Sequence, residues 1–151
     1  LKAEAVLAEV GTGGDLALVG CDSVLALGGD IHGKPYTDEA VRERWRLMRG
    51  RTGELVTGHH LAVVRDGTVH RDTRAATTRV TFADVTDDEV EAYLATGEPH
   101  HCAGAFTIDG YGGPFVERLE GDPHNVVGIS LPLLRRMLAD AGVAWPTLWR
   151  R

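Results

Sequence analysis

The first candidate for chemistry in this chain is an aspartate directly after an apolar run. Asp22 follows the run Leu16–Cys21. Burial of a carboxylate at the end of a buried strand costs free energy unless a metal ion or hydrogen-bond donors compensate for it. Asp22 is therefore a candidate for holding a divalent cation or activating a water molecule. The alternative is an aspartate that only caps a turn, and Asp22 alone does not decide between the two.

The second candidate is Lys34, in the triplet Gly33-Lys34-Pro35. A proline restrains the preceding residue to an extended backbone, so the ammonium group of Lys34 would be presented at a fixed place. That arrangement suits a phosphate clamp, while the alternative is an ordinary surface lysine. The chain contains no GxxxxGK[ST] sequence, which excludes a P-loop mechanism.

Two further segments could approach a ligand, the first through small residues and the second because it precedes a helix. Ala103-Gly104-Ala105 lets backbone amides approach a ligand closely, or allows only tight strand packing. The segment 120–128 precedes a helix that Ser130 caps, and helix N-termini attract anions. A turn that merely orients this helix explains the second segment equally well.

Histidines and a cysteine suggest a rival reading, a transition-metal site. The residues concerned are His59, His60, His100, His101, Cys102 and His124. Their spacing fits no standard zinc pattern, so we interpret them as surface or packing residues. Cys21, within an apolar run, is expected to lie in the core.

The composition limits the classes of function. With 151 residues, 43% of them hydrophobic, the chain is long enough for one domain with its own core. Sixteen Lys and Arg against 22 Asp and Glu give a net charge of −6, which repels nucleic acid and favours a free nucleotide in a local basic pocket. No apolar run reaches the roughly 18 residues of a membrane span. Two cysteines form no disulfide framework, so we expect a cytoplasmic protein.

Hydrophobic periodicity predicts mixed helices and strands around one sheet. Asp66-Gly67 between apolar residues predicts a hairpin, and Thr86 with Glu89 predicts a helix start. The expected helices lie at 3–10, 38–50, 86–97 and 130–142. The expected strands lie at 16–21, which continues extended through 24–27, and at 55–64, 77–82, 105–108 and 115–116.

The motifs occur in an order that resembles the Maf family, the septum-formation inhibitor homologues. The series is G-x-D-S ending at Ser23, the GKP turn at Lys34, TGEP around Glu98, AGAF at 103–106 and GDPHNVVGISLPLL at 121–134. The similarity runs from about Lys2 to Ala141. Each motif is unspecific alone, whereas the ordered set is specific.

This resemblance implies an α/β fold of the Maf/ITPase-like kind, with an elongated, twisted mixed sheet and two lobes around a cleft. We expect a single domain over residues 1–151, incomplete at its N-terminus, because the family's Ser-x-Ser-Pro-Arg-Arg segment is not in the sequence. The implied activity is hydrolysis of a nucleoside triphosphate to a monophosphate and pyrophosphate with Mg²⁺ or Mn²⁺. The family's older name implies the alternative, a non-catalytic nucleotide-binding regulator of septum formation. Homodimers are common in the family.

The resemblance also assigns roles to individual residues. Asp22 matches the catalytic aspartate and a metal ligand, and Lys34 and Lys2 match catalytic lysines. Ser23, Glu98 and Asp109 fall at substrate-binding positions. Cys102 and Asp109 stand where dTTP/UTP-type members carry Lys and Gln, so the resemblance leaves the preferred base open.

Overall fold

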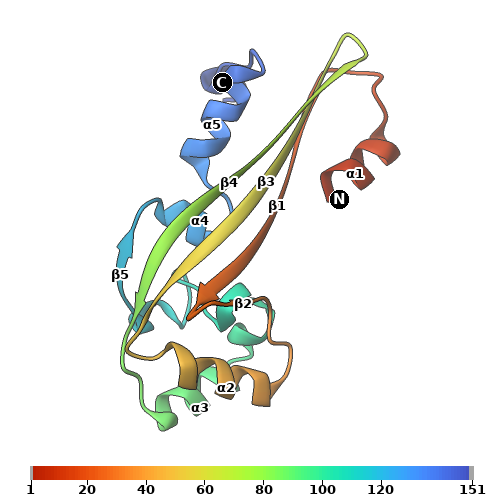
Figure 1. Ribbon diagram of the computed structural model, residues 1–151. Helices are drawn as coiled ribbons and strands as arrows, with labels where there is room; N and C mark the ends of the chain where they lie inside the picture. Colours follow the sequence, from red (N-terminus) through yellow and green to blue (C-terminus); the bar gives the residue numbers. More distant parts are fainter. Residues whose placement is uncertain (1, 150–151) are drawn as a thin grey trace.

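A computed structural model describes residues 2–149 as an elongated α/β molecule built on one twisted five-stranded sheet (Figure 1). The strand order is β2-β1-β3-β4-β5. A mixed sheet was expected, but every pairing within residues 2–149 is antiparallel. The long strands β1, β3 and β4 lie side by side, each antiparallel to its neighbour. The strands β3, β4 and β5 pair in the order in which they follow one another along the chain, which is the pattern of an antiparallel meander.

The elements have the following bounds. In chain order they are α1 (Lys2–Val10), β1 (Leu16–Leu27), β2 (Asp30–His32), α2 (Asp38–Met48), β3 (Thr52–Arg65), β4 (Thr68–Phe82), α3 (Asp87–Ala95), the 3-10 helices η1 (Glu98–His101), η2 (Ala103–Ala105) and η3 (Gly113–Phe115), β5 (Val116–Glu120), α4 (Pro123–Val127), α5 (Leu131–Asp140) and the 3-10 helix η4 (Trp145–Leu148). No helix among them is long and apolar enough to cross a bilayer.

Two local sequence signals are confirmed. Asp66 and Gly67 have φ values of 47° and 76° and join β3 to β4, as a tight hairpin turn requires. The Thr86 side chain accepts from the Glu89 backbone N–H while the Glu89 carboxylate accepts from the Thr86 N–H, so α3 begins with a capping box.

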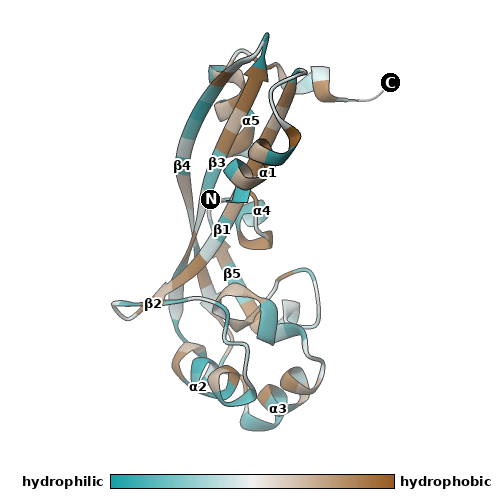
Figure 2. Cartoon of the chain, turned by 90° about the vertical axis from the view of Figure 1, so that its right-hand side faces the viewer, coloured by the Kyte–Doolittle hydropathy of each residue, from teal (hydrophilic) through white to brown (hydrophobic). Residues whose placement is uncertain are grey.

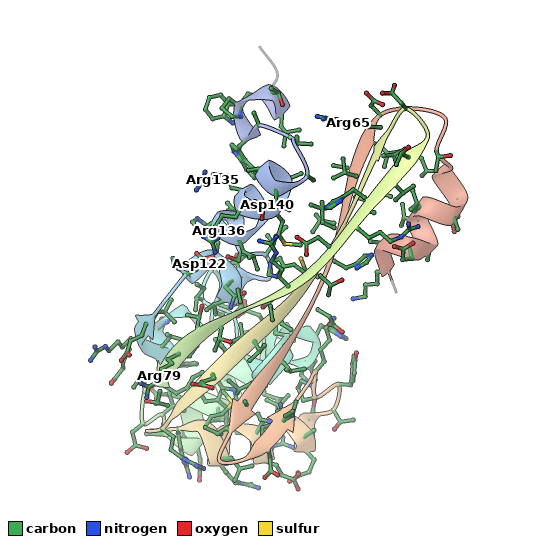
Figure 3. All side chains as sticks on the ribbon, turned by 45° about the horizontal axis from the view of Figure 1, so that its top comes forward. Arg65, Arg79, Asp122, Arg135, Arg136 and Asp140 are labelled. Atoms are coloured by element: carbon green, nitrogen blue, oxygen red, sulfur yellow. The ribbon has the colours of Figure 1, made fainter. Side chains whose placement is uncertain are left out.

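The half of the sheet near the hairpin is covered on both faces. Along β3, Leu61 and Val63 pack with α5, whereas Ala62 and Val64 pack with Leu7 of α1. Alternate residues of a strand point to opposite faces, which explains why this stretch is buried without interruption. Figure 2 shows hydrophobic segments of β1 and β3 where α1 and α5 flank the sheet. Arg65, near the hairpin (Figure 3), donates to the Gly142 carbonyl at 3.0 Å and ties this end of the sheet to the end of α5.

The other half of the sheet packs on α2 and α3 around one aromatic cluster. Trp45 is fully buried and makes edge-to-face contacts with Phe82, Tyr93 and Phe115. Its indole N–H donates to the Ala105 carbonyl at 2.9 Å. Close-packed aromatic rings with a hydrogen-bonded indole have few alternative arrangements. This half of the molecule therefore holds the segments attached to it in fixed positions.

Three sequence expectations are corrected. The run Leu16–Cys21 was expected to be fully buried but alternates between half-buried and exposed, because β1 pairs only with β3 over this stretch and α5 does not cover it. The expected strand at 105–108 is instead the 3-10 turn η2 followed by irregular chain, since Gly104 and Ala105 have left-handed φ values of 72° and 62°. Near 115, η3 precedes a strand that begins at Val116.

One short helix was not expected. Asp122, labelled in Figure 3, caps α4 by accepting from the His124 backbone N–H at 3.0 Å. This segment was expected to be a turn or an anion-binding approach to α5.

Candidate functional site

A cavity of about 260 Å³ lies beside the unpaired edge of β1, where the two halves of the molecule meet. It collects residues from α1, β1, the loop after β2, the η1–η2 segment and α4. The lining residues are Lys2, Cys21, Asp22, Ser23, Lys34, Leu55, His101, Cys102, Ala103, Phe106, Thr107, Val126, Val127 and Gly128. Four residues singled out in the sequence, Lys2, Asp22, Ser23 and Lys34, therefore share one cavity.

Asp22 lies in the middle of β1 with an exposed side chain. Its Oδ1 accepts only a 3.2 Å bond from the Ser23 backbone N–H, and no ion pair engages it within residues 2–149. Its cross-strand partner is Gly58, and Asp22, Gly20 and Gly58 also line a second hollow of about 290 Å³ on the α1 side. The carboxylate is therefore open to solvent and to a ligand.

Lys2 enters the cavity from the first turn of α1. A β-carbon at Gly20 would lie 3.1 Å from the backbone nitrogen of Ala3, so α1 approaches the sheet as closely as it does because residue 20 is glycine. The same glycine-lined hollow contains both Lys2 and Asp22.

Lys34 enters from the opposite side on a loop whose backbone is held at both flanks. The Gly33 carbonyl accepts from the Gly104 backbone N–H at 3.3 Å and from Arg44 Nη1 at 3.0 Å. On the other flank, the Tyr36 N–H donates to the His100 carbonyl at 3.0 Å. The Lys34 side chain is exposed and forms no ion pair with the residues that the structure describes.

Ser23 lies next to Asp22 but faces the other side of the sheet, because successive residues of a strand alternate. Its hydroxyl is 2.8 Å from the Thr57 hydroxyl, which donates to the Asn125 carbonyl at 3.1 Å. Ser23 thus lines the cavity and also links β1 to β3 and α4.

Glu98 and Asp109 lie outside the residues that line the cavity. Glu98 accepts from the Tyr93 hydroxyl and from the backbone N–H groups of Tyr111 and Gly112. Asp109 is exposed and accepts from the hydroxyl of Thr107, which does line the cavity. Asp109 thus contacts the cavity through Thr107, whereas none of the three partners of the Glu98 carboxylate lines the cavity.

The two cysteines both face the cavity, so the expectation that Cys21 lies in the core is wrong. Burial raises the pKa of each thiol above its usual value, which outweighs the opposing effects of Lys2 near Cys21 and of Lys34 near Cys102. Both thiols are therefore protonated at neutral pH in the absence of a bound ligand.

The histidines do not gather into a metal site. His59 is buried, with Nε2 accepting from the Ser130 N–H at 2.8 Å and Nδ1 3.0 Å from the Thr57 carbonyl. His100 Nε2 lies 2.7 Å from Asp38. Within residues 2–149 no three His, Cys, Asp or Glu side chains are placed to hold a metal ion together. The structure thus favours packing and surface roles for these histidines over the transition-metal alternative.

One wall of the cavity was not expected from residue chemistry. Leu55, Phe106 and Val126 are buried and give the cavity an apolar part of its lining. Phe106 and Val126 belong to the AGAF and GDPHNVVG motifs. The motifs therefore marked these segments, but apolar side chains gave no sign that they would line the site.

Known proteins resemble this chain over most of its length. The family model described as "Maf-like protein" matches residues 1–141. Proteins named "Nucleoside triphosphate pyrophosphatase" are similar to the chain: that of Cutibacterium acnes is 58% identical over 89% of this chain and 63% of its own length. Those of Nocardia farcinica and Salinispora tropica are 52% and 53% identical, over 99% and 100% of this chain and 71% and 67% of theirs. The chain spans about two thirds of the length of these relatives, and it belongs to the Maf family.

Proposed function

We propose that the protein hydrolyses nucleoside triphosphates between the α and β phosphates, releasing a nucleoside monophosphate and pyrophosphate. The observation that carries the proposal is the exposed carboxylate of Asp22 in one cavity with the ammonium groups of Lys2 and Lys34. The names of the relatives point to the same reaction.

These residues suit the charge changes of the reaction. A water oxygen attacks the α phosphorus, the bond from that phosphorus to the bridging oxygen breaks, and the electron pair leaves with pyrophosphate. Asp22 orients the water and accepts its proton. Lys2 and Lys34 approach from two sides and neutralise charge on the phosphates, which stabilises the transition state more in a partly dry cavity than in open water.

The other candidate residues have binding and structural roles in this proposal. The Ser23 hydroxyl contacts the nucleotide from the cavity wall, and Asp109 acts through the Thr107 hydroxyl. Glu98 holds the loop at residues 111–112 in place. The apolar residues Leu55, Phe106 and Val126 offer a surface for an uncharged part of the nucleotide.

A divalent cation fits this site as part of a complex with the substrate. Mg²⁺ and Mn²⁺ prefer oxygen ligands, and Mg²⁺ is commonly bound by one or two carboxylates together with substrate phosphates. Asp22 offers one exposed carboxylate of this kind. When bound, the cation supplies further neutralisation of phosphate charge.

The test is pyrophosphate release from a panel of nucleoside triphosphates by the full-length protein with Mg²⁺ or Mn²⁺. Asp22→Asn is expected to lower the rate by about 10²–10³-fold, as for loss of a group that stabilises the transition state. Asp30→Asn removes an exposed carboxylate outside the cavity and serves as the charge-matched control. Tight nucleotide binding without pyrophosphate release would favour the regulator of septum formation instead. Unchanged activity in Asp22→Asn would refute the role given to this carboxylate.

A further inference from the structure

One carboxylate fastens α1 to two strands of the sheet next to the cavity. Oε1 of Glu4 lies 2.7 Å from His60 Nε2 and accepts from Arg71 Nε at 2.8 Å, while Oε2 accepts from Arg71 Nη2 at 3.2 Å. His60 Nδ1 lies 2.7 Å from the Thr73 hydroxyl. The four side chains form one connected cluster, called here the Glu4 cluster, which joins α1 to β3 and β4.

The Glu4 cluster acts on the end of α1 that carries Lys2. Glu4 is in the first turn of the helix, close to Lys2 along the chain. The apolar attachment of α1 lies mainly at its far end, where Leu7 packs with Ala62 and Val64 and with three half-buried side chains, Leu16, Leu18 and Val69. Near the start of the helix Ala3 lies against Gly20. Because the start has a small apolar contact, directional bonds are needed there to fix the rotation and position of the helix.

The Glu4 cluster also borders the site itself. His60 and Thr73 line the hollow that Asp22 shares with Lys2. His60 pairs with Gly20 in the sheet, so its ring lies on the same face as the carboxylate of Asp22. The cluster is therefore near enough to set where Lys2 lies relative to Asp22.

The charged partners of Glu4 keep its carboxylate ionised. The bonds from Arg71 and then His60 lower the pKa of Glu4 to about 2. Glu4 is thus ionised over the whole neutral range. Its guanidinium partner balances the negative charge, so the cluster adds little repulsion toward a polyphosphate in the neighbouring cavity.

We propose that Glu4, with Arg71 and His60, is a positioning group that holds Lys2 in the cavity close to Asp22. The inference rests on the proposed function, since it assigns to Lys2 the neutralisation of substrate charge. Glu4 touches neither substrate nor reacting atoms, and it acts only through the place of the helix.

A double-mutant cycle tests this role in the full-length protein. Lys2→Ala, Glu4→Ala and the double variant are compared with the parent for kcat, KM and melting temperature, with pyrophosphate release from a nucleoside triphosphate as the assay. Glu4→Ala is expected to lower kcat/KM by about ten- to a hundredfold, as misplacement of a reacting group does. In the Lys2→Ala background the same change is expected to have no further effect, because the group it positions is gone.

Controls separate positioning from stability and from simple charge. Glu9→Ala removes an exposed carboxylate of the same helix that forms no ion pair within residues 2–149, and its activity is expected to match the parent. If Glu4→Ala does not fold, Glu4→Gln, which cannot hold the Arg71 guanidinium as a charged pair, replaces it in the cycle. Equal losses in both backgrounds, or no loss, would overturn the inference. A lower KM would also overturn it, since it would mean that Glu4 only repels the substrate. An inactive parent protein would instead refute the proposed function.

Discussion

The hydroxyl of Tyr93 donates to Oε1 of Glu98 at 2.8 Å, and the same oxygen accepts from the Gly112 backbone N–H at 3.0 Å. The other oxygen accepts from the Tyr111 N–H at 2.9 Å. A β-carbon at Gly110 would overlap this carboxylate, so glycine at that position lets the loop wrap around Glu98 without displacing its side chain. Glu98 is thereby the anchor of the loop that leads into β5.

Removal of the Glu98 carboxylate should cost stability. Glu98→Ala leaves two backbone N–H groups and one buried tyrosine hydroxyl without their acceptor. We expect a loss of roughly 2–3 kcal/mol in the free energy of unfolding, the range for hydrogen bonds to a charged group. Urea unfolding of Glu98→Ala measures it, with Glu117→Ala, an exposed β5 carboxylate without an ion pair in the described chain, as the control. Equal free energies of unfolding in both variants would show that the hydrogen bonds of Glu98 do not stabilise the fold.

The same anchor should depend on pH. Burial raises the pKa of Glu98, but the N–H donors of Gly112 and Tyr111 and the Tyr93 hydroxyl outweigh it, so the pKa is lowered overall. A carboxyl group whose pKa is lowered in the folded state stabilises the fold at any pH above its pKa in the unfolded state. That stabilisation is lost as the pH falls through the pKa of the folded state. The difference in melting temperature between the parent and Glu98→Gln should therefore be greatest near pH 7 and shrink toward pH 3. A difference that grows on acidification would contradict this account.

Glu98 also shows what the sequence could and could not predict. The TGEP motif marked the residue, but the partners that occupy its carboxylate lie at 111–112, and no local pattern indicates which way a side chain points. Local signals succeeded: Asp66-Gly67 forms the hairpin and Thr86 caps α3, since each depends on neighbours in the chain. The motif series also named two residues that are distant in sequence and share a cavity, since Asp22 and Lys34 both line it, together with Lys2.

Expectations failed where distant contacts decide the backbone. The segment after Cys102 reads as a strand, yet Gly104 has a left-handed φ because it packs under Leu25 and donates to Gly33. The apolar run Leu16–Cys21 reads as fully buried, yet it lies along the sheet edge. The backbone angle of Gly104 and the exposure of Leu16–Cys21 depend on contacts with residues distant in sequence, so the neighbouring residues do not predict them.

Gly104 supplies the second test of stability. A β-carbon there would lie 3.0 Å from Leu25 and 3.1 Å from Phe106, at a φ of 72° that L-residues rarely adopt. Gly104→Ala is expected to destabilise the fold by about 1–3 kcal/mol through crowding and backbone strain. Gly13→Ala, where nothing lies within 4 Å, should change stability by less than about 0.5 kcal/mol. Thermal unfolding compares the two, and equal effects would refute the packing argument.

Arg44 supplies a test of the Lys34 loop. Its guanidinium donates to the Gly33 carbonyl at 3.0 Å, next to the proposed catalytic lysine. Arg44→Met keeps much of the apolar stem but removes this donor, so we expect kcat/KM to fall by about tenfold while the melting temperature changes little. Arg46→Met is the control, because Arg46 lies on the same helix and, among residues 2–149, forms a surface ion pair with Glu39 alone. Loss of activity in both variants alike would assign the effect to charge and not to the loop.

Gly20 supplies a test of how closely α1 must approach the sheet. A β-carbon there would meet the backbone nitrogen and β-carbon of Ala3 at 3.1 and 3.2 Å, and backbone cannot give way as a flexible side chain does. Gly20→Val should push the start of α1 outward, move Lys2 away from Asp22 and lower kcat/KM by about ten- to a hundredfold. Gly20→Ala should have a smaller effect in the same direction. Ala17→Val adds the same branched side chain at an exposed position of β1 and should retain activity. Full activity in Gly20→Val would mean that Lys2 need not be held close to the strand.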